Sequence, residues 1–229
     1  MPLLPFMSSF FDDTENFGLM LFIAGIVGII ASVVAIAYIC SLGGGYFAAY
    51  LSGYVTGFVI LCVGTLITSL VILLFGLNVR GSGNKISFLA GLSDFIGTPS
   101  NDKPGLLTGL TRVVGITSII GGVFGIASGA MLYGGFVGNG IFAILVGIFL
   151  YWLAPQILGE SKLFDKNILW IILIIVYVLE ALYSLGGIFL AGFSLWFTLL
   201  AIQSLCMLFV YIFGLLYTVS PEVKELMNV

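Results

Sequence analysis

The stretch Ile168–Leu185, ILWIILIIVYVLEALYSL, holds a single charged residue, Glu180. A helix needs about 20 mostly apolar residues to cross the hydrocarbon core of a bilayer, which is about 30 Å thick. Because the apolar run is continuous and does not alternate with polar residues, it predicts a transmembrane helix and not a strand of a membrane barrel.

The composition of the whole chain indicates the same class of protein. Of the 229 residues, 61% are hydrophobic and 7% are charged, whereas about 25% of the residues in a soluble domain are charged. The apolar fraction is too high for a disordered chain, and three cysteines are too few for a disulfide framework. We therefore predict an all-α integral membrane protein that is surrounded by the lipid bilayer.

Six runs are long and apolar enough to cross the bilayer by this rule. The predicted spans are Phe17–Ser41, Phe47–Leu77, Leu106–Leu132, Phe136–Ile157, Ile168–Ala191 and Leu195–Val219. Asp13 or Thr14 can cap the first helix, since both residue types accept hydrogen bonds from free backbone N–H groups. Pro221 cannot continue the last helix, because it has no backbone N–H group.

The six spans divide the chain into a membrane bundle and two short ends. Residues 17–219 would form three helical hairpins, with an N-terminal segment at 1–16 and a tail at 220–229. The three turns on the outer side of these hairpins are very short and carry no charge. The connection at 78–105 is long, and the apolar residues in its first half fit either a short interfacial helix or an irregular loop.

All the basic residues fall on one side of the predicted bundle. They lie at Arg80, Lys85, Lys103, Arg112, Lys162, Lys166 and Lys224. Loops rich in Lys and Arg remain in the cytoplasm, so both termini should be cytoplasmic, and we expect the plasma membrane as the location. The net charge of −3 gives no reason to expect nucleic acid as a partner.

Small residues recur every four positions in the second and third spans. The predicted packing residues are Gly45, Ala49, Gly53, Gly57, Gly121, Gly125 and Gly129. Helices gain little from hydrophobicity when they associate within a bilayer, whereas small residues allow two backbones to approach closely. We expect these stripes to pack the two spans together along their outer halves. A homo-oligomer or other membrane subunits packed on the stripes, and glycine-bearing gates of a transport path, are the alternatives.

Glu180 is the one acidic residue inside a predicted span. It stands about 12 residues from either end of its helix, which places it near the middle of the bilayer. A charged residue there costs about 2.5–3.5 kcal/mol on insertion scales, so acidic residues in spans are rare and face the bundle interior or water. Because burial disfavours the charged form, we expect a neutral carboxyl group unless a cation or water reaches it.

Polar side chains surround Glu180 in the predicted bundle. Tyr177, Tyr183 and Ser184 lie at i−3, i+3 and i+4 and share its helical face. Gln203 of the next span is expected at a similar depth. The carboxyl group could titrate on a path for protons or a small cation, or it could form a hydrogen bond across the hairpin that only fixes the helix register.

These observations leave two main classes of function. The first is a small transporter or channel-like subunit with Glu180 as its ionisable element. The second is a non-transporting membrane subunit or scaffold that assembles with other membrane chains through glycine-rich helix faces. We do not expect an enzyme, because the chain has no histidine and its sequence shows no nucleophile–base pair or paired carboxylates. For the same reasons we expect no cofactor and no metal site.

Overall fold

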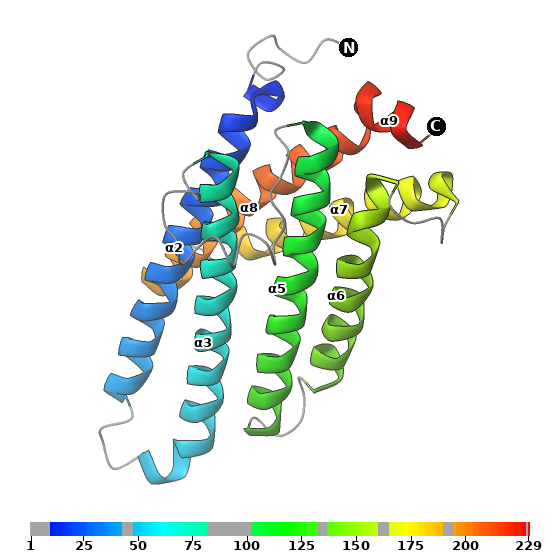
Figure 1. The fold of residues 1–229 in the computed structure, drawn as a ribbon. Coiled ribbons are helices and arrows are strands. Elements are labelled where there is room, and N and C mark those ends of the chain that lie inside the picture. The colour runs from blue at the N-terminus through cyan, green and yellow to red at the C-terminus, as the bar shows by residue number, and fades with distance from the viewer. Residues whose placement is uncertain are drawn as a thin grey trace.

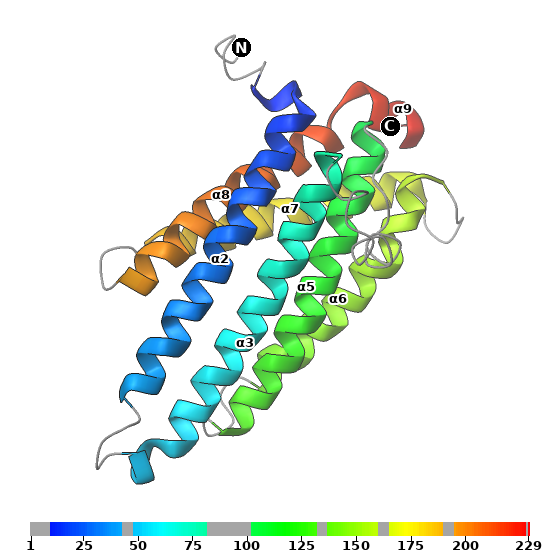
Figure 2. The ribbon, with the colours of Figure 1, turned by 60° about the vertical axis from the view of Figure 1, so that its left-hand side comes forward.

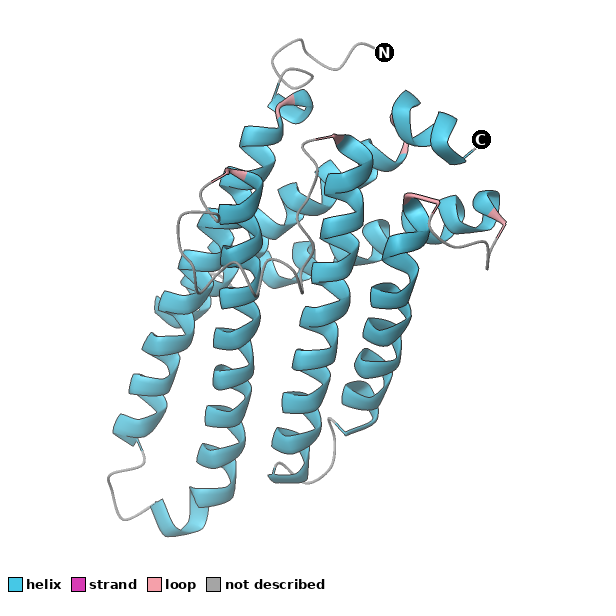
Figure 3. Cartoon of the chain, in the orientation of Figure 1, coloured by secondary structure: helices cyan, strands magenta, loops and turns pink. Residues whose placement is uncertain are grey.

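Almost all of the chain that the computed structural model describes is helical, and the rest of that part is short loops and turns (Figure 3). The described residues are 10–42, 48–81, 102–131, 137–159, 165–189, 195–227 and 229. The helices are α2 (Thr14–Leu42), α3 (Ala48–Val79), α5 (Lys103–Met131), α6 (Val137–Ile157), α7 (Lys166–Ile188), α8 (Leu195–Thr218) and α9 (Pro221–Met227). All but α9 are long and apolar enough to cross a membrane. The prediction of an all-α membrane protein with six spans is confirmed.

The helix starts follow from capping residues. The Asp13 carboxylate accepts a hydrogen bond from the backbone N–H of Glu15 at 2.8 Å, so Asp13 caps α2. The side chain of Asp165 caps α7 in the same way, by accepting from the backbone N–H of Asn167 at 3.3 Å. A chain in a bilayer must satisfy its backbone groups within the helix or at caps, and these two spans each begin directly after such a residue.

The short helix α9 was not predicted, although its start signal is present in the sequence. The backbone N–H of Val223 points to the Ser220 hydroxyl at 3.5 Å, and Pro221 occupies the first helical position, where proline is favourable. Lys166 of α7 donates to the carbonyl oxygen of Leu226 at 2.6 Å and so holds the end of α9. The proline therefore ends α8, as predicted, and also begins a new helix.

The six long helices form a row of four and a crossing pair. The helices α2, α3, α5 and α6 run side by side, and the α7/α8 hairpin crosses this row obliquely (Figures 1 and 2). Consecutive helices pack most extensively, as α5 with α6 and α2 with α3. Contacts of α3 with α5, and of α2 with α8, join the three hairpins into one bundle.

The helices of the first two hairpins meet at glycines that are not those predicted. In the α5/α6 hairpin, Gly115 faces Gly147 and Gly122 faces Gly140. A Cβ atom added to any of these four would lie only 2.6–2.8 Å from the carbonyl oxygen of its partner. In the α2/α3 hairpin, a Cβ atom on Gly25 would lie 2.6 Å from the Leu73 Cα atom. These distances are shorter than real Cβ contacts, so only glycine fits.

Two of the glycines that were predicted to pack the third span against the second do not contact α3. Outside the neighbouring backbone of α5 itself, no atom of the described residues lies within 4 Å of a Cβ atom placed on Gly121, so the prediction was wrong for this residue. A Cβ atom on Gly125 would meet Gly140 of α6 at 3.7 Å, and not α3. The physical reason is the helix period: a four-residue repeat drifts by about 40° per step, whereas the seven-residue spacing of Gly115 and Gly122 drifts by only about 20° and stays on one face.

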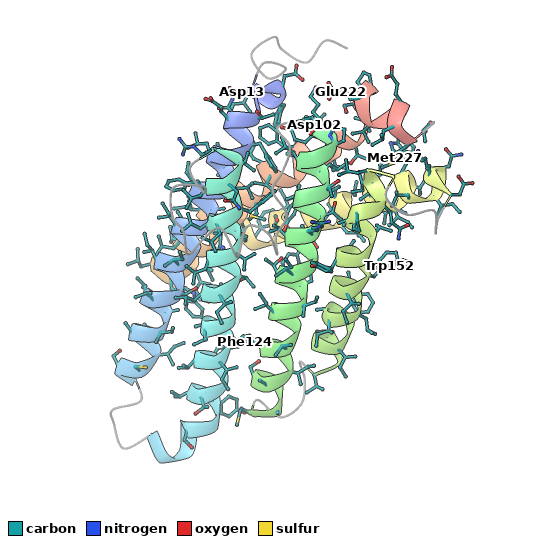
Figure 4. The ribbon with its side chains drawn as sticks, in the orientation of Figure 1. Asp13, Asp102, Phe124, Trp152, Glu222 and Met227 are labelled. Carbon is teal, nitrogen blue, oxygen red and sulfur yellow. The ribbon has the colours of Figure 1, made fainter. Side chains whose placement is uncertain are left out.

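The prediction that the second and third spans are neighbours agrees with the contacts of α3 with α5. Phe124 of α5 packs over Gly64 of α3 (Figure 4), and a Cβ atom on Gly53 would be in ordinary contact with the carbonyl oxygen of Met131, at 3.5 Å. Among the other predicted packing residues, Gly57 and Gly129 are buried. Gly45 and the side chain of Ala49 lie outside the described residues, as do the three outer turns and the predicted interfacial segment, with Lys85 and Lys162.

Charged side chains gather at the end of the bundle where α9 lies, as the labelled Asp13, Asp102 and Glu222 show (Figure 4). The Lys103 ammonium group lies 3.4 Å from the Asp12 carboxylate and 3.8 Å from that of Glu222. These ion pairs connect the start of α5 to the N-terminal segment and to α9. Because such exposed pairs each contribute only about 0–1 kcal/mol, the apolar core carries most of the stability of this end.

Candidate functional site

Glu180 lies where α7 and α8 pack together. Its carboxyl group shares a hydrogen bond with the hydroxyl group of Tyr211 on α8. Two turns further along α7, Gly187 is in close contact with the Ser204 hydroxyl group. The two pairs are seven residues apart on each helix, which is the spacing of a continuous antiparallel contact line. On this contact line, the α7 residue that follows Glu180 is therefore a glycine, Gly187.

The buried stripe of α7 determines where Glu180 points. The buried residues of this helix are Leu169, Leu173, Tyr177 and Ser184. Glu180 stands between the last two on the same face, three residues after one and four before the other, so its side chain turns toward the bundle. Its burial is incomplete.

Tyr177 forms a second polar contact one turn away from Glu180. Its side chain is fully buried, and its hydroxyl oxygen lies 2.7 Å from the Thr111 hydroxyl oxygen of α5. Either of these two hydroxyl groups could be the donor to the other, because both also lie within hydrogen-bonding distance of the Leu107 carbonyl oxygen, Thr111 at 2.8 Å and Tyr177 at 3.5 Å. The ring of Tyr177 packs over Gly214 of α8. One side chain therefore links α5, α7 and α8.

Gln203 does not lie beside Glu180. Its side-chain amide donates to the Ser69 hydroxyl group of α3 at 3.1 Å, and both groups are in close contact with Gly28 of α2. Gln203 and Tyr211 are eight residues apart, which turns them about 80° from each other around the helix axis. Gln203 thus joins α8 to α2 and α3, while Tyr211 faces α7.

Tyr211 was not predicted as the partner of Glu180 because the two helices of the hairpin are shifted along each other. Placing Gln203 at the depth of Glu180 assumes that α7 ends and α8 begins at the same level. In the register set by the Glu180–Tyr211 and Gly187–Ser204 pairs, the residue opposite Ile188, the end of α7, is Gln203 itself. The start of α8 therefore extends eight residues beyond α7, and no feature of the sequence reports that shift.

The two remaining predicted neighbours of Glu180 have opposite environments. Ser184 is buried at 5% exposure, on the side of α7 that faces the bundle. Tyr183 is 83% exposed. The structure therefore brings Glu180 together with Tyr177 and Ser184 inside the bundle and leaves Tyr183 on the outer surface beside them.

The structure defines the class of this protein, but it does not identify a related protein. Six long apolar helices make this chain a multi-pass integral membrane protein. Comparisons with protein-family models, curated proteins and solved structures gave no match. Over the part of the chain that the structure describes, no group of three or more Cys, Asp or Glu residues could hold a metal ion. The Glu180 site is thus the main chemical feature from which a function can be inferred.

Proposed function

We propose that this protein is a small transporter or channel-like subunit of the plasma membrane, in which Glu180 binds and releases a proton or a small cation. The observation that carries the proposal is a half-buried carboxyl group on a membrane-spanning helix, hydrogen-bonded to Tyr211. Ionisable residues within spans are costly and are typical of ion pathways and proton relays. A glycine and a serine form the next contact of the same two helices, so packing alone does not require an acid here.

The chemistry of the pair supports proton exchange. A tyrosine hydroxyl group can donate a hydrogen bond to a carboxylate, and it can accept one from a carboxylic acid. Tyr211 can therefore remain bonded to Glu180 before and after the proton leaves. The buried hydroxyl groups of Tyr177 and Thr111, one turn toward the end of the bundle where α9 lies, add further groups that can pass or receive a proton.

A second function, that of a non-transporting subunit, is favoured by a separate observation. The outer surface of α7 exposes large side chains, with Leu179 and Leu182 each 60% exposed beside Tyr183. Such a surface could bind another membrane chain, and Glu180 would then only stabilise the hairpin. In both cases we place the two termini in the cytoplasm, because the charged end of the bundle carries Lys103 and Lys166. We propose no enzymatic activity and no cofactor.

The test is proton flux into lipid vesicles that contain the purified protein and a trapped pH-sensitive dye. We expect Glu180→Gln to lower the flux driven by a pH gradient at least about tenfold, because the amide cannot carry a proton away. The matched control is Glu225→Gln, which makes the same chemical change at an exposed residue of α9, and its flux should equal that of the wild type.

Two results would reject the transport function. One is a Glu180→Gln variant that is folded, as judged by circular dichroism, and retains the wild-type flux. The other is a wild-type flux no greater than that of vesicles without protein under an imposed gradient of pH or of a small cation. Either result would favour the non-transporting subunit.

A further inference from the structure

The short helix α9 lies against the three helices that carry the candidate site. It packs on α5, α7 and α8 (Figure 1), and Tyr177 links the same three helices. The two buried residues of α9, Val223 and Met227, are 0% and 1% exposed. They belong to one hydrophobic core with Leu169, Leu173 and Tyr177 of α7. The helix therefore covers one end of the core in which the site lies.

Two lysines hold α9 across the starts of α5 and α7. Lys166, the first residue of α7, donates to the carbonyl oxygen of Leu226 at 2.6 Å. Lys103, the first residue of α5, has its ammonium group 3.8 Å from the Glu222 carboxylate. A helix of seven residues is too short to be stable alone in water. The helix α9 is therefore stabilised by these contacts and by its two buried side chains.

An apolar layer separates α9 from the polar groups of the site. The buried stripe of α7 begins with Leu169 and Leu173, which are 2% and 0% exposed, and only then reaches Tyr177. The hydroxyl group of Tyr177 meets that of Thr111 on α5 just beyond these leucines. Water from the charged end of the bundle meets α9 and then the two leucines before it reaches this pair. An apolar constriction of this kind stops water and ions by dewetting.

We infer that α9 is a built-in seal, which closes the entrance to the Glu180 site at the charged end of the bundle. The site then exchanges protons with this side only while α9 is detached from α5 and α7. Because short elements at the end of a bundle open locally, the wild type keeps a flux that α9 limits. The inference rests on the proposed function for the role of the site and adds the regulation of that site. The seal itself is a property of packing, so it can be tested without any flux.

The first test measures the access of water to position 111 in lipid nanodiscs, where a membrane-impermeant thiol reagent reaches both faces. In a full-length chain whose three native cysteines are replaced by alanine, Thr111→Cys should react slowly, because Thr111 is 1% exposed. Adding Val223→Asp should raise the rate at least about tenfold, since an unpaired buried charge is costly and α9 would detach. Val229→Asp is the matched control. It makes the same change at a residue that is 47% exposed, and the rate should not change.

A second variant and a second cysteine distinguish release of α9 from general unfolding. Met227→Asp should act in the same way as Val223→Asp, because it changes the other buried side chain of α9. In a chain that keeps only the native Cys62, the rate should stay low in both variants, because Cys62 is buried in a separate cluster with residues of α2, α3 and α8. An unchanged rate for Thr111→Cys in both variants would overturn the inference. An equal rise at Cys62 would also overturn it, because α9 would then stabilise the whole bundle.

Proton flux separates this inference from the proposed function. In dye-loaded vesicles the flux of Val223→Asp should exceed that of the wild type several-fold, and Glu180→Gln added to the same chain should remove the gain. Increased thiol access without any flux would support the seal and reject transport. Increased flux without increased thiol access would overturn the seal and leave transport supported.

Discussion

Replacing Gly122 with alanine should lower the free energy of unfolding by about 1–3 kcal/mol, the usual cost of overpacking a tight site. The new Cβ atom would lie 2.6 Å from the carbonyl oxygen of Gly140 and 2.9 Å from the backbone nitrogen of Ile144. Both are backbone atoms of α6, so the contact is relieved only if the two helices move apart. That movement would weaken the packing along the whole α5/α6 hairpin.

The adjacent residue provides a matched control. A Cβ atom on Gly121 would meet no described atom within 4 Å beyond the neighbouring backbone of α5, so Gly121→Ala should change stability only through helix propensity, which favours alanine by about 0.5–1 kcal/mol. Two neighbouring glycines should therefore respond in opposite directions. The measurement is reversible unfolding of both variants in the same detergent, followed by circular dichroism. Equal effects at the two positions would show that the α5/α6 contact is wrongly placed.

A larger loss is expected when the first two hairpins are both changed. A Cβ atom on Gly25 would lie 2.6 Å from the Cα atom and 2.7 Å from the nitrogen of Leu73 on α3, so Gly25→Ala should cost about as much as Gly122→Ala. The two sites share no contacting residue, and the effects of such sites usually add within about 0.5 kcal/mol. The double variant should then lose about 2–6 kcal/mol relative to the wild type.

The same unfolding assay tests this additivity. A double variant that loses no more than the worse single variant would mean that the two hairpins do not pack independently. Coupling would then have to pass through the contacts between α3 and α5, such as the packing of Phe124 over Gly64. Our account predicts instead that the two losses add.

The spans were predictable because the thickness of the bilayer fixes the length of an apolar helix. The predicted span Ile168–Ala191 compares with Lys166–Ile188 in the structure, and Phe47–Leu77 compares with Ala48–Val79. The oblique crossing of α7 and α8 was not predictable. In a soluble protein the polar face of a helix indicates which side is buried, but both faces of these helices are apolar, so the sequence gives little indication of which helices are neighbours.

The site was predictable in part, for a similar reason. A lone carboxyl group in an apolar run is conspicuous, so Glu180 could be identified from the sequence, together with its helical neighbours Tyr177 and Ser184. Its partner on the next helix depends on how far α8 is shifted along α7. That shift is set by side-chain packing. Because of it, the partner of Glu180 is Tyr211 and not the expected Gln203. The α5/α6 glycines were missed because four- and seven-residue spacings coexist in one helix, and only the packing distinguishes them.

Infrared difference spectra of the protein in lipid, recorded as the pH is changed, would report directly on the proton of Glu180. A protonated carboxyl group has a carbonyl stretching band that a carboxylate lacks. For a proton-exchanging Glu180 we predict a band that decreases as the pH rises, is missing in Glu180→Gln, and shifts in Tyr211→Phe because a hydrogen bond is lost. A Glu180 band that stays constant at every pH at which the protein is folded would contradict proton exchange and would make this carboxyl group a fixed contact between α7 and α8.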